Sequence, residues 1–262
     1  MATLDPVDYA LHLPPKHARD ELDQDEEWCE IETTGGERRR IRFHDYAAIY
    51  EVPGLYERLF AEQLDCESPR VVTELLGEAL RDAGLKPEQL TALDFGAGNG
   101  MVGELLGELA VGEIVGVDLL PEARDAAHRD RPGLYEDYYA LDLTQLAADG
   151  RRDLMRHDFD LMTCVAALGF GDIPPLAFAE AFNLVGSPGW VAFNLRDRFF
   201  EEESSGFGGL IARMLREGIV EERTRTRYTH RISVAGEALE YVAIVAQKHA
   251  DVPLAWVRDA ED

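Results

Sequence analysis

The amino-acid sequence contains a run of glycines and carboxylates whose spacing suits the binding of a nucleotide-like ligand. Residues 93–104 read Leu-Asp-Phe-Gly-Ala-Gly-Asn-Gly-Met-Val-Gly-Glu, so Gly96, Gly98 and Gly100 are spaced by two. Glycine suits a tight turn against a ligand because it has no Cβ atom and adopts positive φ readily. A helix that starts after the turn would offer free backbone N–H groups to a polar or anionic group. The run therefore predicts a ligand-binding turn between a strand and a helix.

Hydrophobic patterning predicts the elements that position this turn. Residues 91–95 form an apolar strand, and strands and helices then alternate as a doubly wound parallel sheet requires. An antiparallel hairpin closes the series, so we expect an α/β fold with a mostly parallel, seven-stranded sheet and helices on both faces. The further strands are predicted at 113–117, 138–141, 159–164 and 190–195, the helices at 121–129, 143–155, from Pro174-Pro175 onward and at 204–217, and the hairpin at 220–234 and 239–247.

The N-terminal quarter differs in composition and is predicted to lie outside the sheet. Residues 1–28 are rich in Asp, Glu and Pro and are expected to form a solvated arm, followed by a β-hairpin over 28–43 and a helical segment over 44–63. Ser68-Pro69 predicts the start of an amphipathic helix over 69–83, with Ser68 as its N-cap. The expected organisation is an arm, hairpin and lid-like segment (1–67), a ligand-binding core (68–250) and a tail (251–262).

The glycine run matches two cofactor patterns, and its register distinguishes them. The dinucleotide pattern G-x-G-x-x-G occurs at 98–103, and Asp118 follows Gly98 at a suitable distance. That pattern should begin with the glycine that closes the strand, which is Gly96, and it would then need glycine where Met101 stands. What remains is an acidic residue, Asp94, followed by three glycines at alternate positions. This closely resembles the first motif of class I S-adenosylmethionine-dependent methyltransferases.

The resemblance covers roughly residues 43–250 and implies a Rossmann-like methyltransferase fold with S-adenosylmethionine as cofactor. In that family the glycine turn wraps the methionine part of the cofactor, and the acidic residue after the second strand, here Asp118, accepts hydrogen bonds from the ribose hydroxyls. The position of Asp142 corresponds to a carboxylate that accepts from the adenine amine, and Leu143 would pack on the ring. The alternatives are an ordinary helix-start aspartate for Asp118 and an N-cap for Asp142.

Aromatic residues before the core resemble a lid that closes over the cofactor in many small-molecule methyltransferases. Tyr46 and Tyr50 are four residues apart, and a plain amphipathic helix face is the alternative. The complete set of residues predicted to bind the cofactor is Tyr46, Tyr50, Asp94, Gly96, Ala97, Gly98, Asn99, Gly100, Asp118, Leu119, Asp142, Leu143 and Cys164, although core packing is the favoured interpretation of Cys164.

The acceptor is predicted to be a small molecule. Residues 163–170, after the fourth strand, lack the Asp/Asn-Pro-Pro-aromatic motif of enzymes that methylate nucleobase amino groups. Direct displacement of methyl from a sulfonium needs mainly alignment and exclusion of water. No catalytic base is therefore assigned, and His44, Tyr50 and Asn194 are only candidates. A nicotinamide-dependent oxidoreductase and a non-catalytic S-adenosylmethionine-binding regulatory protein are the alternative functions.

Composition sets the expected partners and compartment. The formal net charge of −25 repels phosphate backbones, so nucleic acid is not an expected partner. The longest apolar run, 161–170, is too short to span a bilayer, and no signal pattern begins the chain, so we expect a cytoplasmic protein without membrane contact. Cys29, Cys66 and Cys164 are predicted to be reduced thiols and form no metal-ligand spacing. The sequence predicts no oligomeric state.

Two arginine-rich hairpins are open to two interpretations. Arg38, Arg39, Arg40 and Arg42 lie in the first, and Arg223, Arg225, Arg227 and Arg231 lie in the second. Guanidinium groups suit the recognition of carboxylates or phosphates. The favoured interpretation is that they are exposed charges paired with the many glutamates and protecting strand edges.

Overall fold

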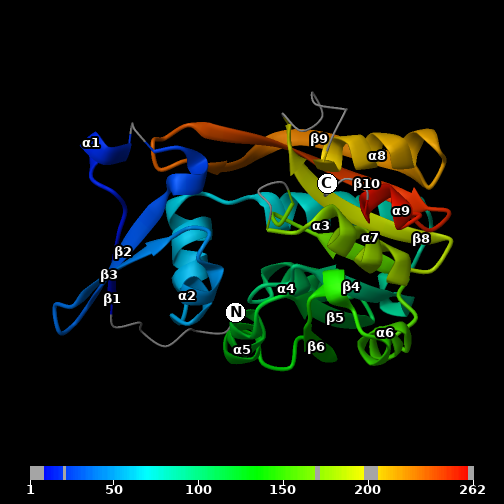
Figure 1. Cartoon of the computed structure of the whole chain (residues 1–262), viewed down its shortest axis with the longest axis horizontal. Coiled ribbons are helices and arrows are strands. Elements are labelled where there is room, and N and C mark those ends of the chain that lie inside the picture. The colour runs from blue at the N-terminus through cyan, green and yellow to red at the C-terminus, as the bar shows by residue number, and fades with distance from the viewer. Residues whose placement is uncertain (1–8, 20–21, 169–171, 198–205, 259–262) are drawn as a thin grey trace.

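The computed structural model describes residues 9–19, 22–168, 172–197 and 206–258. Its larger sheet has seven strands in the order β6-β5-β4-β7-β8-β10-β9 (Figure 1). The strands are β4 (Thr91–Phe95), β5 (Glu113–Asp118), β6 (Asp137–Ala140), β7 (Leu161–Cys164), β8 (Gly189–Arg196), β9 (Val220–Ile232) and β10 (Ala238–Lys248).

Strand pairing confirms the predicted sheet. β4 to β8 pair in parallel, whereas β10 is antiparallel to both β8 and β9. The chain enters at β4 in the centre, adds β5 and β6 on one side and then returns to add β7 and β8 on the other. The carboxyl ends of the central strands β4 and β7 therefore lie where the strand order reverses, which is where ligands bind in open α/β sheets.

Helices cover both faces of this sheet. Side chains of β5 and β8 alternate between two apolar clusters: Trp190 and Ala192 face α3 and α4, whereas Val191 and Phe193 face α6, α7 and α8. This period of two is what a strand buried on both faces requires. The helices of the core are α3 (Ser68–Asp82), α4 (Met101–Glu108), α5 (Pro121–Asp130), α6 (Ala148–Met155), α7 (Pro175–Leu184), α8 (Gly206–Arg216) and α9 (Ala255–Arg258).

The N-terminal elements form a second, three-stranded sheet at the left of Figure 1. The predicted hairpin is present as β2 (Trp28–Thr33) and β3 (Arg38–Arg42), but the prediction of a solvated arm over 1–28 is wrong where this segment is described. Tyr9–His12 forms β1 and pairs antiparallel with β2. Alternation of Tyr9 and Leu11 toward the apolar cluster under this sheet lets β1 cover an otherwise free strand edge.

The remaining N-terminal elements lie between β1 and β2 or between β3 and the core. They are α1 (Lys16–Arg19), the 3-10 turn η1 (Gln24–Glu26), α2 (Tyr46–Tyr50) and the π-helix η2 (Glu57–Gln63). The tip of the β9–β10 hairpin extends over them, and Val234 packs into their apolar cluster. Glu27 is buried there and binds both the Arg231 guanidinium and the backbone N–H of Val234. The hairpin at the end of the chain thus holds the N-terminal sheet.

Three sequence predictions need correction or restriction. The helix predicted over 143–155 is divided into a 3-10 turn, η4 (Leu143–Gln145), and α6, because Leu146 and Ala147 adopt extended backbone and Leu146 packs on the core. Ser68 is the first residue of α3 and not its N-cap, since its hydroxyl is bound elsewhere. Residues 204–205 of the predicted helix over 204–217 lie outside the described residues. Within the described ranges, no helix is long and apolar enough to cross a membrane.

Candidate active site

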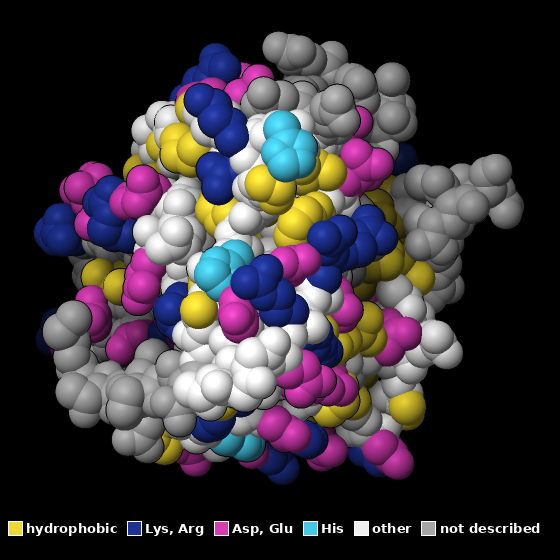
Figure 2. All heavy atoms as spheres, turned by 90° about the vertical axis from the view of Figure 1, so that its left-hand side faces the viewer, with side chains coloured by type: hydrophobic (Ala, Val, Ile, Leu, Met, Phe, Trp, Pro, Cys, Tyr) yellow, Lys and Arg dark blue, Asp and Glu magenta, His cyan; other side chains and the backbone are white. Residues whose placement is uncertain are grey.

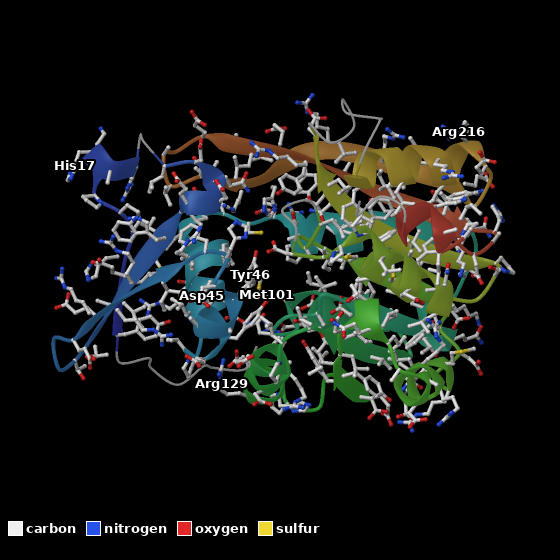
Figure 3. All side chains as sticks on the ribbon, viewed as in Figure 1. His17, Asp45, Tyr46, Met101, Arg129 and Arg216 are labelled. Atoms are coloured by element: carbon white, nitrogen blue, oxygen red, sulfur yellow. The ribbon has the colours of Figure 1, made fainter. Side chains whose placement is uncertain are left out.

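A cavity of about 370 Å³ lies beyond the carboxyl ends of the central strands. Its floor comes from the ends of β4, β5, β6 and β7, and its opposite wall comes from the segment 44–56. Figure 3 shows Asp45 and Tyr46 at this boundary between the N-terminal elements and the larger sheet. The predicted residues that line the cavity are Tyr46, Tyr50, Gly96, Asp118, Leu119, Asp142 and Leu143. This volume is in the range of sites for cofactors and other small ligands.

The glycine turn has the backbone that its sequence predicts. Gly96, Gly98 and Gly100 adopt φ of +71°, +55° and +94°, a region that side chains other than glycine rarely enter. Gly96 lines the cavity, and a Cβ atom there would approach Ala167 to 3.0 Å. Gly98 lies under the Tyr50 ring, and its carbonyl accepts from the Tyr138 hydroxyl at 2.6 Å. The turn is therefore held from both sides by tyrosines.

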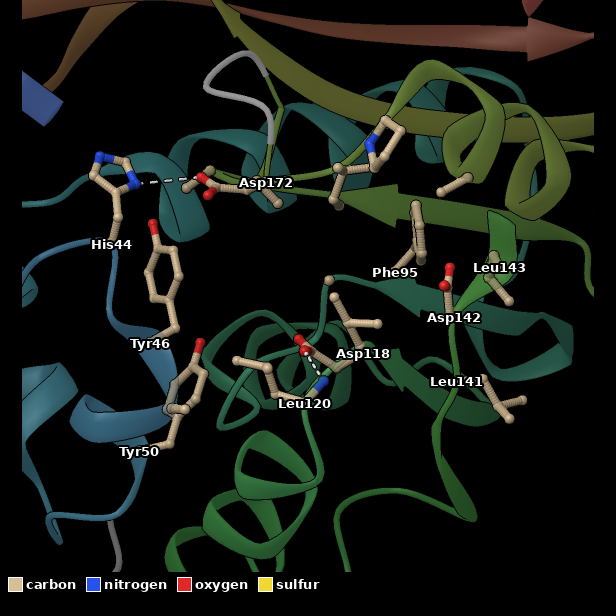
Figure 4. A pocket seen from close by; sticks show the side chains of 18 of the residues that line it. His44, Tyr46, Tyr50, Phe95, Asp118, Leu120, Leu141, Asp142, Leu143 and Asp172 are labelled. Carbon is tan, nitrogen blue, oxygen red and sulfur yellow. Dashed lines mark hydrogen bonds and ion pairs between the residues drawn. The ribbon is translucent and has the colours of Figure 1, made fainter. Parts of the chain in front are cut away.

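Asp118 faces the cavity from the end of β5 and supports the glycine turn. Its carboxylate accepts from the backbone N–H of Gly98 at 2.9 Å. It also accepts from the backbone N–H of Leu120 at 3.0 Å (Figure 4). Burial raises the pKa of this carboxyl, while the backbone N–H bonds lower it. The residue is thus more than an exposed helix-start charge.

Asp142 caps η4 and also lines the cavity, so both predicted placements coexist. Its Oδ1 accepts from the Thr144 backbone N–H at 2.8 Å and from the Thr144 hydroxyl at 2.6 Å. The Thr144 hydroxyl bond is the main reason that the pKa of Asp142 is lowered. Around it the cavity wall is apolar, with Phe95 and Leu143 in Figure 4 and Leu119, whose side chain is 58% exposed at the rim.

Asp94 is buried beneath the turn and is absent from the cavity lining. Its carboxylate accepts from the Tyr135 hydroxyl at 2.8 Å and from the Thr163 hydroxyl at 2.9 Å. Burial raises its pKa to about 6, although both hydroxyl groups act to lower it. Asp94 joins β4, β7 and the loop before β6 beneath the glycines.

The aromatic wall consists of Tyr46, Tyr50 and Tyr56. Tyr50 lies between the other two, with ring centroids 6.2 Å from Tyr46 and 5.4 Å from Tyr56. His44 stands at the end of this row, and its Nδ1 lies 3.4 Å from Asp172 Oδ2 (Figure 4). Burial raises the pKa of Tyr50 well above its usual range. Tyr50 is therefore a neutral phenol at physiological pH and a poor base.

Besides Asp94, five of the predicted cofactor residues lie in the turn or beneath it without lining the cavity: Ala97, Gly98, Asn99, Gly100 and Cys164. The Asn99 side chain donates to Glu57 Oε1 at 2.5 Å, which ties the turn to η2. Cys164 is fully buried in the core, as its favoured interpretation predicts. All three cysteines are free thiols.

Asn194, one of the candidate bases, lies outside the cavity. Its Oδ1 accepts from the backbone N–H of Ala166 at 2.7 Å. Ala166 has φ of +57° and lines the cavity. Asn194 therefore holds the loop after β7 in an unusual backbone conformation, and it is suited to positioning rather than to proton transfer.

Sequence reasoning missed several lining residues because tertiary structure brings them together. Asp172, Ile173 and Pro174 approach from the start of α7, and their sequence carries no motif of cofactor binding. Tyr56 could have been found, since it continues the aromatic series of Tyr46 and Tyr50. Among the described residues, no group of three or more His, Cys, Asp or Glu side chains could hold a metal ion.

The arginines of both hairpins are mainly paired with acidic side chains, as the favoured interpretation predicts, but that interpretation is wrong for Arg231, which is buried against Glu27. In the first hairpin, Arg38 lies 2.7 Å from Glu32 and Arg40 lies 3.0 Å from Glu30. In the second, Arg223 lies 2.9 Å from Glu221, and Arg225 pairs with Glu222. Exposed pairs of this kind contribute little to stability.

Comparison with known proteins places the central part of the chain in a defined family. Residues 93–193 match the model of a methyltransferase domain. No curated protein matches the sequence.

Solved structures resemble the chain at low sequence identity. The N-methyltransferase NodS from Bradyrhizobium japonicum WM9, solved with S-adenosyl-L-homocysteine, has a TM-score of 0.52 and 14% identity over 79% of this chain and 97% of that chain. A S-adenosylmethionine-dependent methyltransferase from Clostridium acetobutylicum ATCC 824 has a TM-score of 0.49 and 13% identity over 75% and 97%. A ribosomal protein L11 methylase from Lactobacillus delbrueckii subsp. bulgaricus has a TM-score of 0.45 and 18% identity over 68% and 78%.

The domain match covers the glycine turn and the strands β4 to β8 that build the cavity. The similarity to the NodS structure extends over 79% of this chain and so includes more than the matched domain. Residues 93–193 therefore form a methyltransferase domain, and the chain has the fold of an S-adenosylmethionine-dependent methyltransferase.

Proposed function

We propose that the protein transfers the methyl group of S-adenosylmethionine to a small-molecule acceptor by direct displacement. The observation that carries this proposal is the wall of the cavity opposite the strand ends. Residues 44–56 cover that side with His44 and three tyrosines, so the chain itself walls the reaction site opposite the strand ends. A site walled on two sides excludes part of the solvent and admits a small acceptor more readily than a macromolecule.

The cofactor fits the residues around the cavity. Its methionine part would lie along Gly96, which lines the cavity without a Cβ atom, and would reach Gly98 once Tyr50 moves aside. Asp118 would accept from the ribose hydroxyls, and Asp142 from the adenine amine. Leu119 and Leu143 offer apolar surface to the flat ring. Each of these groups lies at the carboxyl end of a strand or just after it.

The other predicted cofactor residues would act through the turn. Asp94 accepts hydrogen bonds from hydroxyl groups of two elements and so fixes the end of β4. Ala97, Asn99 and Gly100 shape the turn itself, and Cys164 packs behind it. We propose positioning roles for all of them.

The chain's contribution to the transfer would be alignment. When bound, the cofactor supplies a methyl group on a positively charged sulfur, and the tyrosine wall would hold the acceptor in line with it. Of the three candidate bases, His44 is the best placed, because it lines the cavity and is a histidine paired with Asp172. The buried phenol of Tyr50 resists ionisation, and Asn194 has no basic group.

The surface charge also favours a small acceptor over nucleic acid. The net charge is −25, whereas nucleic-acid-binding proteins carry a basic footprint. On the face seen in Figure 2, which includes the N-terminal sheet, basic side chains are interspersed with acidic ones. The arginines there are neutralised locally and form no continuous basic surface in this view.

The proposal is tested in two stages. S-adenosylmethionine and S-adenosylhomocysteine should each raise the melting temperature by mass action, whereas NAD should not. The purified protein should then transfer a labelled methyl group to members of a small-molecule panel, and not to total RNA or to a mixture of ribosomal proteins. Stabilisation by NAD alone would overturn the cofactor assignment, and methylation of RNA or protein alone would overturn the acceptor class.

A further inference from the structure

A second, smaller cavity adjoins the cofactor cavity on the side of the β9–β10 hairpin. Its volume is about 40 Å³. The two cavities share a wall that consists of His44, Tyr46, Tyr56, Ala166, Ala167 and Asp172. The walls found only in the second cavity include Cys66, His230, Arg231 and Tyr241. Since a single water occupies about 10–15 Å³ by this kind of measure, the space holds a group of a few heavy atoms.

His230 is the main polar side chain of this cavity with a ring nitrogen that has no hydrogen-bond partner among the described residues. Its side chain is buried, with 7% of the residue exposed, and its Nδ1 lies 2.6 Å from the Ser68 hydroxyl. Among the described residues, the opposite ring nitrogen, Nε2, has no hydrogen-bond partner. Because Nδ1 points to α3 and the residue lines the cavity, Nε2 is the ring nitrogen available to an occupant.

The hydrogen-bond network around Ser68 assigns the tautomer of His230. Asn194 Oδ1 accepts from the Ala166 N–H, so its Nδ2 must donate to Ser68 Oγ at 2.9 Å and to Tyr228 Oη at 2.7 Å. Tyr228 and Ser68 are 2.6 Å apart, and because the phenol hydrogen has no other acceptor among the described residues, Tyr228 donates to Ser68. Ser68 then has two donors and gives its own hydrogen to His230 Nδ1. The remaining imidazole proton is on Nε2.

His230 stays neutral in this environment. Burial, together with the guanidinium groups of Arg231 and Arg196, lowers its pKa to about 3. Arg231 is itself paired with Glu27, and Arg196 donates to Gln24 at 2.8 Å. The group that His230 presents to the cavity is therefore the N–H of an uncharged imidazole ring.

We propose that His230 is a specificity-determining residue, whose Nε2–H donates to the oxygen of a small acyl group, a carboxylate or an amide, on the methyl acceptor. This inference rests on the proposed function, because it places the acceptor beside the cofactor cavity. His44 and Tyr46 line both cavities, so the acyl group would lie next to the site of the methyl donor. An acceptor with an acyl oxygen close to its nucleophile would reach both cavities.

Histidine nitrogen NMR tests the proposal on the full chain. With ¹⁵N-labelled histidine, His230 should show the Nε2–H tautomer and should keep it down to pH 5. Acetate and acetamide are the probes, and either should shift the His230 Nε2 resonance in a saturable way. A larger response to acetate identifies a carboxylate, and a larger response to acetamide identifies an amide. Methylammonium, which has a similar size and no acceptor oxygen, should cause no shift.

A matched variant separates the donor from the structural role of the ring. His230→Asn keeps an acceptor oxygen where Nδ1 accepts from Ser68, but it has no group in place of Nε2–H. It should keep the melting temperature within a few degrees and weaken the favoured probe at least tenfold, monitored through the Tyr46 and Tyr241 signals. Ser68→Ala should instead leave the probe bound while mixing the two tautomers.

Three outcomes would overturn the inference: an Nδ1–H tautomer, no saturable response of Nε2 to either probe, or unchanged probe affinity in folded His230→Asn. None of these measurements requires the cofactor. A failure to bind S-adenosylmethionine in the thermal assay would therefore count against the proposed function, and it would be distinguishable from a failure at His230.

Discussion

The hydroxyl oxygen of Tyr50 lies against the backbone of Gly98, so that a Cβ atom on Gly98 would come within 2.5 Å of it. This contact joins the N-terminal segment to the centre of the cofactor turn. Two separate constraints therefore favour glycine at position 98: its positive φ of +55° and the tyrosine packed on it. The aromatic wall and the glycine turn are therefore one unit.

Gly98→Ala is expected to destabilise the protein and to impair cofactor binding. Forced positive φ costs about 1–3 kcal/mol, and displacement of Tyr50 adds to this cost. Gly84→Ala is the matched control, because Gly84 has φ of +69° and a Cβ atom added there would meet no atom within 4 Å. Urea unfolding should give a larger loss for Gly98→Ala than for Gly84→Ala.

Tyr50→Phe should partly rescue Gly98→Ala. The hydroxyl is the closest atom to the added Cβ, at 2.5 Å, and the next ring carbon is 3.3 Å away. A double-mutant cycle on the free energy of unfolding measures this coupling. Additive effects of the two substitutions would show that backbone strain alone explains the glycine.

Asp118→Asn is expected to weaken S-adenosylmethionine binding by about 1–3 kcal/mol, because a buried hydroxyl loses its acceptor. The substitution also places an amide next to the N–H groups of Gly98 and Leu120, so stability should fall by roughly 1 kcal/mol. Asp125→Asn, on the exposed side of α5, removes the same charge without touching the cavity. Calorimetry that gives equal dissociation constants for both variants would restrict Asp118 to a structural role.

Asp94 should make stability depend on pH. Its pKa is about 6 in the folded protein and ordinarily 3.8, so the folded state favours the neutral carboxyl. This stabilisation is full below about pH 4 and is lost as the pH rises through 6, by up to about 3 kcal/mol. Asp94→Asn stays neutral, and its free energy of unfolding relative to wild type should therefore increase from pH 4 to pH 7.

Thr163→Val provides a check on the cause of this pH dependence. The Thr163 hydroxyl donates to Asp94 Oδ1 at 2.9 Å and so favours the ionised form. Its removal should move the transition to higher pH. Parallel stability curves for wild type and Asp94→Asn between pH 4 and pH 7 would contradict the raised pKa.

Local sequence patterns were sufficient to predict the core of the fold. The alternation of short apolar strands with helices indicated the parallel sheet, and the three glycines indicated the turn, because both depend on residues close in the chain. β1 could not be predicted in this way, since Tyr9–His12 is a strand only because β2 offers it an edge. The division of η4 from α6 likewise depends on Leu146 packing against the core.

The site was predictable where it follows strand ends and unpredictable where distant elements meet. Asp118 and Asp142 could be located from the strand pattern alone. The second cavity could not, because His230 reaches Ser68 only through the pairing of β9 with β10 and the packing of α3 beneath them. These polar residues form a site only because they are buried together, and burial depends on how the whole chain folds.

The tyrosine wall is expected to open and close as cofactor binds. Tyr50 covers Gly98, so the methionine part of the cofactor can reach the turn only if α2 moves. We expect amide hydrogen exchange over residues 28–55 to be faster without ligand and to slow when S-adenosylhomocysteine is added. Arg129 of α5 allows this motion to be tested. Its Nη1 donates to the Tyr50 carbonyl at 3.0 Å, and the residue does not line the cavity.

Arg129→Ala should therefore speed exchange in α2 of the empty protein and weaken S-adenosylhomocysteine roughly fivefold, which corresponds to the loss of about 1 kcal/mol from one hydrogen bond. Arg124→Ala, which removes an exposed arginine from the same helix, should change neither quantity. If exchange in α2 is already slow in the empty protein and unaffected by ligand, the tyrosines form a fixed wall. The cofactor would then have to enter from the side of Leu119, an exposed residue that lines the cavity.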